Sequence, residues 1–339
     1  MLKVGILGMG GMGWHHARRY PHVPNAEAAN AAIVAIADVI PERLEAKEAV
    51  AINLEGGKVA LDLSQAARYP EAAQLIAEAD VDVVDICLPT YLHAEYAIAA
   101  LEAGLHVLCE KPMALSVADC DRMIAAARAA DRRLMIAQCI RFWPEYLYLH
   151  KLIVEQPLGA LLSLNMSRIG GRPRWSPDNW FLDPKRSGGA LLDLHIHDVD
   201  YVNAVFGVPD ALYATGRAMA EPNSYDVIHA CFTYDNGPQI HMHAGWSTAQ
   251  VPFQAGFDAW FERGFVRYAD WQLTIFDNLE EVEGHPADIE PGDGYLNEIT
   301  YFLECVKTGA QPIRCMPEST RDSVALIDQE IESIKSLVL

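Results

Sequence analysis

The sequence predicts an α/β protein in which a parallel sheet with crossover helices is followed by an α+β domain with a large, mainly antiparallel open sheet. Apolar runs of strand length alternate with helix signals over roughly the first 140 residues, which indicates a parallel sheet. Farther along, Asp235-Asn236-Gly237 and Glu262-Arg263-Gly264 are typical of tight turns, and long strands joined by such turns pair antiparallel. We expect a first domain at 1–140, a second at 141–315, and a C-terminal helix at 316–339 that packs back on the first domain.

A glycine pattern near the N-terminus indicates what the first domain binds. Gly8, Gly10 and Gly13 form G-x-G-x-x-G between an apolar strand, Val4 to Leu7, and a helix, Trp14 to Tyr20. In a Rossmann dinucleotide-binding fold the first glycine makes the turn, the second lets the backbone approach the pyrophosphate, and the third lets helix and strand pack closely. The helix N-terminus offers free N–H groups to the phosphates. The position directly between strand and helix favours this interpretation over an ordinary Gly-rich turn.

An acidic residue ends the second apolar run, Ile33 to Ala37, and supports the same interpretation. Asp38 stands where a carboxylate accepts hydrogen bonds from the adenosine ribose hydroxyls and repels a 2′-phosphate. Neither Arg nor Ser follows it directly, so the sequence favours NAD over NADP. Asp38 lies 25 residues after Gly13, and the Ala- and Asn-rich segment Pro24 to Ala32 explains a spacing longer than usual. The alternative is that Asp38 caps a helix ahead of Pro41.

Composition excludes several classes of partner. The 339-residue chain carries a formal net charge of −20, which argues against nucleic acid and anionic membrane surfaces. No segment approaches the roughly 20 uninterrupted apolar residues that span a bilayer. The first strand is predicted to begin at once, so we expect no signal peptide. The seven cysteines contain no C-x-x-C pair and no disulfide framework, so we expect a cytoplasmic protein.

Three loops that follow strands of the first domain carry polar side chains. They are Pro89 to His93, Glu110-Lys111-Pro112, and Gln138 to Arg141. In open α/β sheets, ligands bind outside the carboxyl ends of the strands. Lys111 could therefore aim its ammonium group at a substrate oxygen and stabilise an alkoxide. The alternative is an ordinary surface lysine.

The second domain contributes an acid/base candidate and a long loop. Asp193 and His197 are four residues apart on a helix predicted from Gly189 to Phe206, so they share one face and could act as a pair. The competing interpretation is a helix start or a core histidine. The polar, Pro- and Trp-rich loop Gly170 to Gly188 is too long for a simple connector and could cover a site.

Two H-x-H pairs offer a metal interpretation. His195 and His197 form one pair, His241 and His243 form the other, and Asp193 could join them around zinc. No sequence pattern fixes the two pairs together, and a half-polar sheet face explains the second pair equally well. We therefore expect no metal.

Taken together, these motifs resemble the glucose–fructose oxidoreductase / inositol dehydrogenase (Gfo/Idh/MocA) family over essentially the whole chain. The resemblance rests on the glycine pattern, Glu110-Lys111-Pro112 and the segment Gly188 to His197. Pro89-Thr90-x-x-His93 and Gln138-x-x-Arg141-Phe142-x-Pro144 also look like segments of this family. The chain departs from the family where Ser187-Gly188-Gly189 replaces three glycines, and where Asn25 to Asn30 adds length to the first crossover.

The resemblance implies a Rossmann domain, a second domain whose open sheet forms oligomer contacts, and nicotinamide-dependent oxidation of a hydroxyl on a sugar, sugar derivative or cyclitol, or the reverse. It implies a homodimer or homotetramer and a catalytic trio of Lys111, Asp193 and His197. The cofactor neighbours that it implies are Gly8, Gly10, Gly11, Met12, Gly13, Asp38, Pro89, Thr90, His93, Glu110, Lys111 and Gln138. Weaker candidates for the substrate pocket, by location only, are Arg168, Arg172, Trp175 and Tyr295.

Two rival functions stay open at this point. The first is a glycosidase or lyase in which NAD oxidises and re-reduces the sugar within one turnover, without net NADH. The second is a non-catalytic nucleotide-sensing protein on the same scaffold, which would need none of the trio. Product analysis separates the first rival from a dehydrogenase, and binding without turnover identifies the second.

Overall fold

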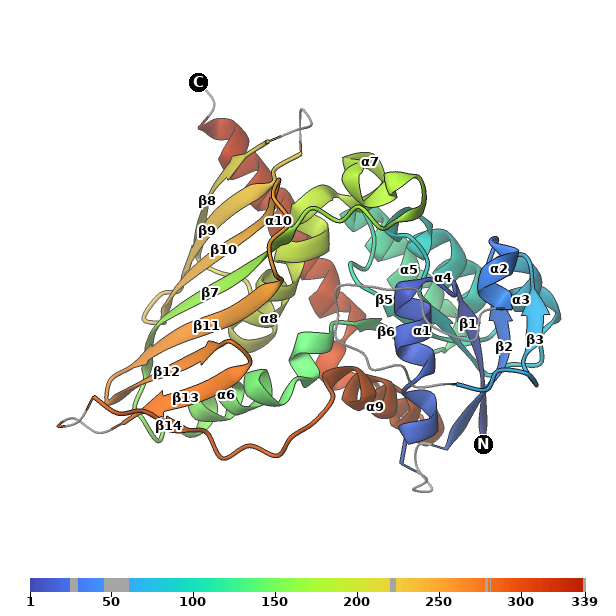
Figure 1. The fold of residues 1–339 in the computed structure, drawn as a ribbon, viewed down its shortest axis with the longest axis horizontal. Helices are drawn as coiled ribbons and strands as arrows, with labels where there is room; N and C mark the ends of the chain where they lie inside the picture. The colour runs from blue at the N-terminus through green and yellow to red at the C-terminus, as the bar shows by residue number, and fades with distance from the viewer. Residues whose placement is uncertain (25–29, 46–60, 220–223, 278–279, 281, 338–339) are drawn as a thin grey trace. The chain divides into compact units, whose positions relative to one another are not determined.

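The computed structural model describes residues 1–24, 30–45, 61–219, 224–277, 280 and 282–337 (Figure 1). Contacts between Cα atoms divide the chain into two compact units, residues 1–142 with 293–321 and residues 143–292 with 322–339. This division differs from the contiguous ranges expected from the sequence, because the chain returns to the first unit at Asp293. Residues 25–29, within the predicted extra length of the first crossover, lie outside the described residues.

The first unit contains a six-stranded sheet with strand order β3-β2-β1-β4-β5-β6. All neighbouring strands described in this sheet pair parallel. This is the strand order of a doubly wound dinucleotide-binding fold, with its switch point between β1 and β4, and it confirms the predicted fold class. Sequence patterns missed the short, polar β3. The strands are β1 (Leu2–Leu7), β2 (Ala31–Ala37), β3 (Ala67–Tyr69), β4 (Val83–Ile86), β5 (His106–Glu110) and β6 (Leu134–Ala137).

The helices of the first unit pack around this sheet, and α5 has a side-chain cap at its first turn. The Oγ of Ser116 accepts a hydrogen bond from the N–H of Asp119 and caps the start of α5, as a capping-box pattern of Ser and Asp does. The helix α9 joins this unit because Phe302 and Leu303 are buried in the same core as Val4 and Trp14. The helical elements are α1 (Gly11–Ala17), η1 (Tyr20–His22), α2 (Pro41–Leu44), α3 (Ala72–Glu78), η2 (Thr90–Leu92), α4 (His93–Glu102), α5 (Val117–Ala130), η3 (Cys139–Phe142), α9 (Gly294–Thr308), η6 (Ile313–Cys315) and the start of α10 (Pro317–Ser336).

The second unit is built on an eight-stranded sheet with order β14-β13-β12-β11-β7-β10-β9-β8. Both predicted turns are hairpins, between β9 and β10 and between β11 and β12. The sheet is antiparallel except where β7 pairs parallel with β10. On its other side β7 pairs with β11, so β7 lies between two strands that follow it in the chain. The strands are β7 (Leu161–Gly171), β8 (Ala211–Arg217), β9 (Val227–Thr233), β10 (Gln239–Ser247), β11 (Gln254–Phe261), β12 (Gly264–Ala269), β13 (Gln272–Phe276) and β14 (His285–Pro286).

Side chains alternate between the two faces of this sheet. On one face Phe257 and Tyr268 pack edge-on against Tyr146 of α6, and helices cover this face in Figure 1. On the other face, which we call the outer face, Trp260 of β11 is 52% exposed and Tyr213 of β8 is 53% exposed. The helical elements of the unit are α6 (Pro144–Glu155), η4 (Pro177–Leu182), α7 (Pro184–Ser187), η5 (Leu191–His195), α8 (Ile196–Phe206) and the rest of α10.

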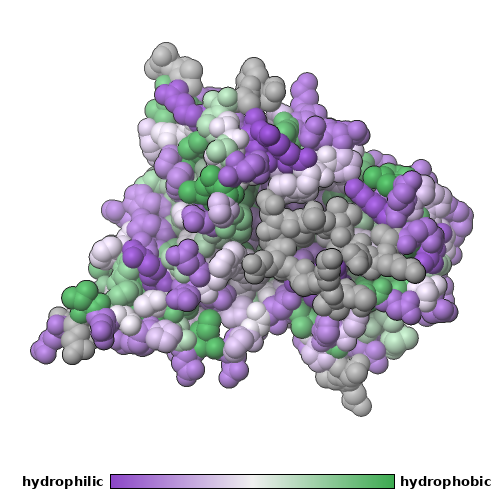
Figure 2. All heavy atoms as spheres, in the orientation of Figure 1, coloured by the Kyte–Doolittle hydropathy of each residue, from purple (hydrophilic) through white to green (hydrophobic). Residues whose placement is uncertain are grey.

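The helix predicted from Gly189 to Phe206 forms, but its first part is not a regular α-helix. Leu191–His195 makes a π-helical turn before α8 begins at Ile196, and Gly207 ends the helix as predicted. Among the described residues, no helix is both long enough and apolar enough to cross a membrane. Figure 2 shows a face on which hydrophilic residues are interspersed with hydrophobic ones.

Candidate functional site

The three pattern glycines have different reasons to lack a side chain. Gly8 adopts a φ of +93°, and a Cβ there would lie 2.6 Å from the carbonyl oxygen of Cys87. A Cβ on Gly13 would lie 1.9 Å from the carbonyl oxygen of Gly8. A Cβ on Gly10 would meet only the guanidinium of Arg43, at 3.6 Å. The protein itself therefore requires Gly8 and Gly13, whereas Gly10 leaves open space at the helix start, as a bound pyrophosphate needs.

Asp38 is fixed beside this loop by the backbone. Its Oδ2 accepts the N–H of Met9 at 2.8 Å, and its Oδ1 accepts the N–H of Ile40 at 2.8 Å. The residue that caps α2 is Ile40, so the helix-cap alternative does not describe Asp38. Arg43 also approaches Asp38, with Nη1 at 3.3 Å from Oδ2. Sequence reasoning missed Arg43 because it considered only the residues that follow Asp38 directly.

A buried ion-pair network joins the glycine-loop helix to the ends of β4 and β5. The Nδ1 of His16 lies 3.0 Å from Asp85, and its Nε2 lies 2.9 Å from the Oε1 of Glu110. Asp85 also accepts hydrogen bonds from the hydroxyl of Tyr20 and, at 3.6 Å, from the thiol of Cys87. Burial alone would lower the pKa of His16, but Asp85 raises that pKa well above its usual range. The sequence signal for this network was the aspartate inside the apolar run of β4.

The predicted neighbours from the other strand-end loops are also largely buried. The two ring nitrogens of His93 lie 2.8 Å from the carbonyl of Pro112 and 2.9 Å from that of Leu88. Burial lowers the pKa of His93, so a neutral ring donates to one of these carbonyls. Gln138 is buried, and its Oε1 has no hydrogen-bond partner among the described residues. Gln138 therefore retains an acceptor for a ligand, while His93 joins two loops of the protein. Pro89 lies at the start of η2, and Thr90 is buried there.

Asp193 and His197 stand out on their helix by exposure. Every residue from Ala190 to Asn203 is buried except these two, which are half-buried. Asp193 lies in the π-helical turn and His197 in the first turn of α8. π-Helical turns are frequent at functional sites. Lys111, half-buried directly after β5, belongs to the first unit, whereas Asp193 and His197 belong to the second.

The four residues proposed by location for the substrate pocket differ in burial and in the side chains that they contact. Arg168 is buried with its guanidinium 2.8 Å from Asp198. Arg172 lies 3.4 Å from the buried carboxylate of Asp226. Trp175 is 39% exposed and follows β7. Tyr295 stands on α9 in the first unit, where its ring packs edge-on against His15 at 4.4 Å and beneath the guanidinium of Arg19 at 5.0 Å.

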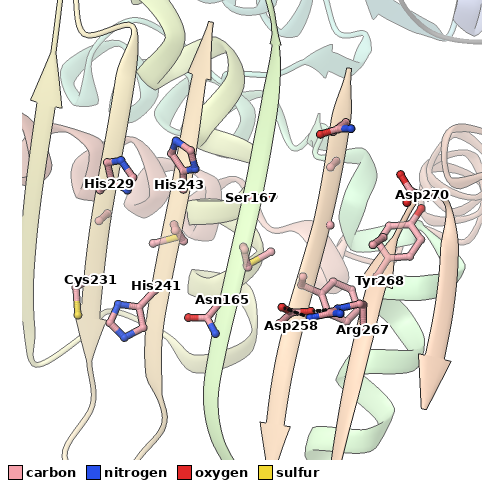
Figure 3. A pocket seen from close by; sticks show the side chains of 18 of the residues that line it. Asn165, Ser167, His229, Cys231, His241, His243, Asp258, Arg267, Tyr268 and Asp270 are labelled. Carbon is pink, nitrogen blue, oxygen red and sulfur yellow. Dashed lines mark hydrogen bonds and ion pairs between the residues drawn. The ribbon is translucent and has the colours of Figure 1, made fainter. Parts of the chain in front are cut away.

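The outer face of the second sheet holds a concavity of about 810 Å³ (Figure 3). The rings of His229 and His243 stack on neighbouring strands, 4.3 Å apart and 5° from parallel, and Figure 3 shows His241 and Cys231 beside them. His195, of the other H-x-H pair, is buried and bonded to Glu330. The metal interpretation required both H-x-H pairs around one ion, and these contacts do not support it.

Among the residues that the structure describes, one group of possible metal ligands lies close together, namely His16, Asp85 and Cys87. In that group the Asp85 carboxylate already accepts from the three donors described above. An imidazole, a phenol and a thiol around one carboxylate satisfy its hydrogen-bonding capacity with protein donors.

Residues 2–138 match the model of an oxidoreductase family with an NAD-binding Rossmann fold, and residues 146–267 match the C-terminal domain of the same GFO/IDH/MocA family. A D-xylose 1-dehydrogenase (NADP(+)) of Haloferax volcanii is 27% identical over 99% of this chain and 98% of its own length. A myo-inositol 2-dehydrogenase of Thermotoga maritima is 29% identical over 65% of this chain and 60% of its own length.

Solved structures confirm the fold. An aldose–aldose oxidoreductase from Caulobacter crescentus, complexed with glycerol, superposes with a TM-score of 0.82 at 22% identity and covers 99% of this chain and 98% of its own. The two family models, the relatives and the two observed sheets agree. The chain therefore belongs to the GFO/IDH/MocA family of oxidoreductases with an NAD-binding Rossmann fold.

Proposed function

We propose that this protein is an NAD-dependent dehydrogenase that transfers hydride between nicotinamide and a hydroxyl of a sugar, sugar derivative or cyclitol. The observation that carries the proposal is the exposure pattern of Asp193 and His197. A polar pair that reaches the surface from an otherwise buried, π-distorted helix has the residue types of an acid/base site. The xylose and inositol dehydrogenases named above support the substrate class.

The residues of the first unit fit a bound dinucleotide. Gly10 leaves a cradle that a Cβ would fill, and Gln138 holds a buried oxygen without a partner among the described residues. The N–H groups of Gly11, Met12 and Gly13 at the start of α1 would bind the phosphates. When bound, the nicotinamide supplies the hydride acceptor or donor. The residues that we propose beside the rest of the cofactor are Asp38, Pro89, Thr90, His93, Glu110 and Lys111.

NAD is our first choice over NADP, because the Asp38 carboxylate would repel a 2′-phosphate. Arg43 is the observation that favours the opposite choice. Its guanidinium lies 3.3 Å from Asp38 and could pair with a 2′-phosphate. The D-xylose relative is named for NADP(+). Cofactor preference is therefore set by the balance between these two side chains.

The chemical roles follow from the residue types. His197 removes the proton of the reacting hydroxyl as general base. Lys111 stabilises the negative charge that develops on the same oxygen. Asp193 orients the imidazole of His197 and contacts the substrate. We propose that Arg168, Arg172, Trp175 and Tyr295 shape the substrate pocket, with Trp175 the first to test because its side chain is the most exposed of the four.

We also propose that the protein forms a homodimer or homotetramer through the outer face. Trp260 and Phe265 lie on this face with ring centroids 4.7 Å apart, and Phe265 lies 5.7 Å from Phe276. A half-exposed aromatic row on an open sheet is the kind of surface that a second copy covers. We assign the protein to the cytoplasm, because all seven cysteines are free thiols.

The test is reduction of NAD, and in parallel of NADP, across a panel of aldoses, polyols and inositols. Turnover by the wild-type protein with one substrate class supports the proposal. His197→Ala should abolish turnover and leave NAD affinity nearly unchanged, whereas His285→Ala, at an exposed histidine, should change neither. Full activity of His197→Ala would refute the assignment. NAD binding without net NADH, but with conversion of a glycoside, would favour the internal redox cycle, and binding without any conversion would favour a sensor.

A further inference from the structure

A continuous row of hydrogen bonds runs behind the Glu110-Lys111-Pro112 loop. It begins at the hydroxyl of Tyr20, passes through Asp85 to His16, and continues to the Oε1 of Glu110. The Oε2 of Glu110 then accepts the backbone N–H of Lys111 at 3.0 Å. The row thus connects the helix of the glycine loop to the backbone of a proposed catalytic lysine within one unit.

Within the row, His16 is the residue whose side chain contacts two carboxylates at once. Its side chain is 0% exposed, and both ring nitrogens face carboxylates, Asp85 on one side and Glu110 on the other. A ring that donates from both nitrogens is an imidazolium, and its raised pKa agrees with that. The ring is therefore held in one orientation, and it fixes the Glu110 carboxylate in turn.

In the described part of the chain, the Glu110 carboxylate contacts His16 and the Lys111 N–H, and four other titratable groups lie near the row. Glu298 of α9 is fully buried, and burial raises its pKa well above the usual range. The ring of Tyr295, also on α9, lies 6.2 Å from that of His16. Burial lowers the pKa of His15 to about 3, so this neighbour is neutral. Arg19, the nearby cation on the same segment, pairs with Asp293. The charge that holds Glu110 from inside the protein is thus that of His16.

The loop is fixed from its other side as well. A ring nitrogen of His93 lies 2.8 Å from the carbonyl of Pro112, one residue beyond Lys111. Lys111 therefore stands between its own backbone N–H, which donates to Glu110, and the next carbonyl, which faces a ring nitrogen of His93. The contact between Glu110 and the Lys111 N–H depends on the buried charge of His16, and a single substitution of His16 removes that charge.

We propose that His16 is a positioning residue for Lys111, which acts by clamping Glu110 and thereby fixing the backbone from which the Lys111 side chain starts. The proposal rests on the catalytic role proposed above for Lys111. Misplacement of a catalytic group by about 1 Å can cost on the order of a hundredfold in rate. A loosened Glu110 affects the orientation of the ammonium group and not the contacts that hold the substrate. The loss therefore falls on kcat and leaves KM nearly unchanged.

The test is a double-mutant cycle with a matched control. His16→Gln should lower kcat by about tenfold to a hundredfold. In a Glu110→Gln background the same change should have little further effect, because His16 acts through Glu110. Tyr20→Phe removes another donor from the same Asp85 carboxylate and leaves the His16–Glu110 contact in place, so its kcat should stay within about twofold of wild type. Additive losses of His16→Gln and Glu110→Gln, or equal losses of kcat in Tyr20→Phe and His16→Gln, would overturn the proposal.

A second measurement does not depend on turnover. Lysines carrying ¹³C-methyl groups give one NMR signal each, and the signal that Lys111→Arg removes belongs to Lys111. This signal should shift in cofactor-free His16→Gln and stay in place in Tyr20→Phe. If the wild-type protein oxidises no sugar or cyclitol, the proposed function fails, but this signal still tests the clamp. If His16→Gln does not fold, Asp85→Asn removes the other carboxylate that holds His16. An unmoved Lys111 signal in the folded variant overturns the clamp.

Discussion

The Nε2 of His16 lies 2.9 Å from the Oε1 of Glu110, and both side chains are buried although 94 residues separate them in the chain. The contact joins α1, which follows the glycine loop, to the end of β5. It thus ties the phosphate side of the proposed cofactor site to the loop that carries Lys111. A charged contact of this kind makes stability depend on pH.

The first prediction concerns how the free energy of unfolding changes above pH 6.5. Because the pKa of His16 is raised in the folded state, its stabilisation is fully present below about 6.5 and is lost as pH rises through the folded-state pKa. His16→Gln should lower the free energy of unfolding by about 3 kcal/mol at pH 6.5, and its stability should decline less between pH 6.5 and 8.5. Urea denaturation at several pH values measures both effects. A variant with the wild-type slope would contradict the assigned charge.

The second prediction concerns Glu298, which is 0% exposed and whose two carboxyl oxygens have no hydrogen-bond partner among the described residues. Its pKa is raised by burial, so its favourable contribution is present below about 4.5 and is lost as pH rises through the folded-state pKa. Glu298→Gln should therefore stabilise the protein at pH 7, by about 1 kcal/mol or more, and flatten the pH dependence above 4.5. Thermal unfolding at pH 5 and 7 measures this. Glu304→Gln on the same helix is the control and should have no such effect.

The third prediction separates folding glycines from ligand-contacting glycines. Gly13→Ala places a Cβ 1.9 Å from a backbone oxygen and should cost about 3 kcal/mol or more. The Cβ of Gly10→Ala meets only the Arg43 guanidinium, at an ordinary contact distance of 3.6 Å and a φ of −74°, so the cofactor-free protein should keep its stability within about 1 kcal/mol. Its affinity for the dinucleotide should nevertheless fall by at least about tenfold, since the methyl group occupies the phosphate position. Unfolding curves and calorimetric titration distinguish the two variants.

The fourth prediction concerns cofactor selectivity. Removal of the Asp38 carboxylate leaves the guanidinium of Arg43 available for a 2′-phosphate, so Asp38→Ala should shift the ratio of kcat/KM toward NADP by about tenfold or more. Arg43→Ala should shift the ratio toward NAD. Initial rates with both cofactors decide the matter. Opposite directions, or no change in Arg43→Ala, would remove Arg43 from the cofactor site. A melting curve of Asp38→Ala controls for the two backbone contacts that Asp38 also provides.

The fifth prediction concerns assembly through the outer face. Trp260→Asp inserts a charge into the aromatic row with Phe265, and it should convert the oligomer into a smaller species. Val154→Asp on α6 exposes the same kind of charge at a residue that is 65% exposed, and its mass should be unchanged. Light scattering after size exclusion measures the mass. An oligomer that survives Trp260→Asp would argue for a different interface.

Local patterns in the sequence predicted much of the fold. The two hairpins and the end of the helix at Phe206 follow from residues a few positions apart. Such features depend on backbone sterics and local hydrogen bonds, which the sequence carries directly. The short strands β3 and β14 were missed, because three or two residues show no periodicity.

Within the site, sequence patterns singled out Gly8, Gly10 and Gly13, and the structure gives each glycine a different spatial reason. Patterns also singled out Glu110 but not its partner. His16 next to His15 in a helix reads as an ordinary polar pair, and only the position of Asp85 on the neighbouring strand makes His16 a buried cation. The meaning of that histidine depends on residues 69 and 94 positions away.

By itself, the sequence determined the two-part α/β architecture, the dinucleotide loop and the residue types of a dehydrogenase, because periodicity, glycine spacing and motif order are local properties. Only the tertiary structure decided that α9 joins the first sheet, that β7 lies between β10 and β11, and that a π-helical turn carries Asp193. It alone brought Arg43 to Asp38 and His16 to Glu110. These outcomes depend on which distant surfaces bury one another, and burial between distant segments leaves no spacing in the chain from which it could be predicted.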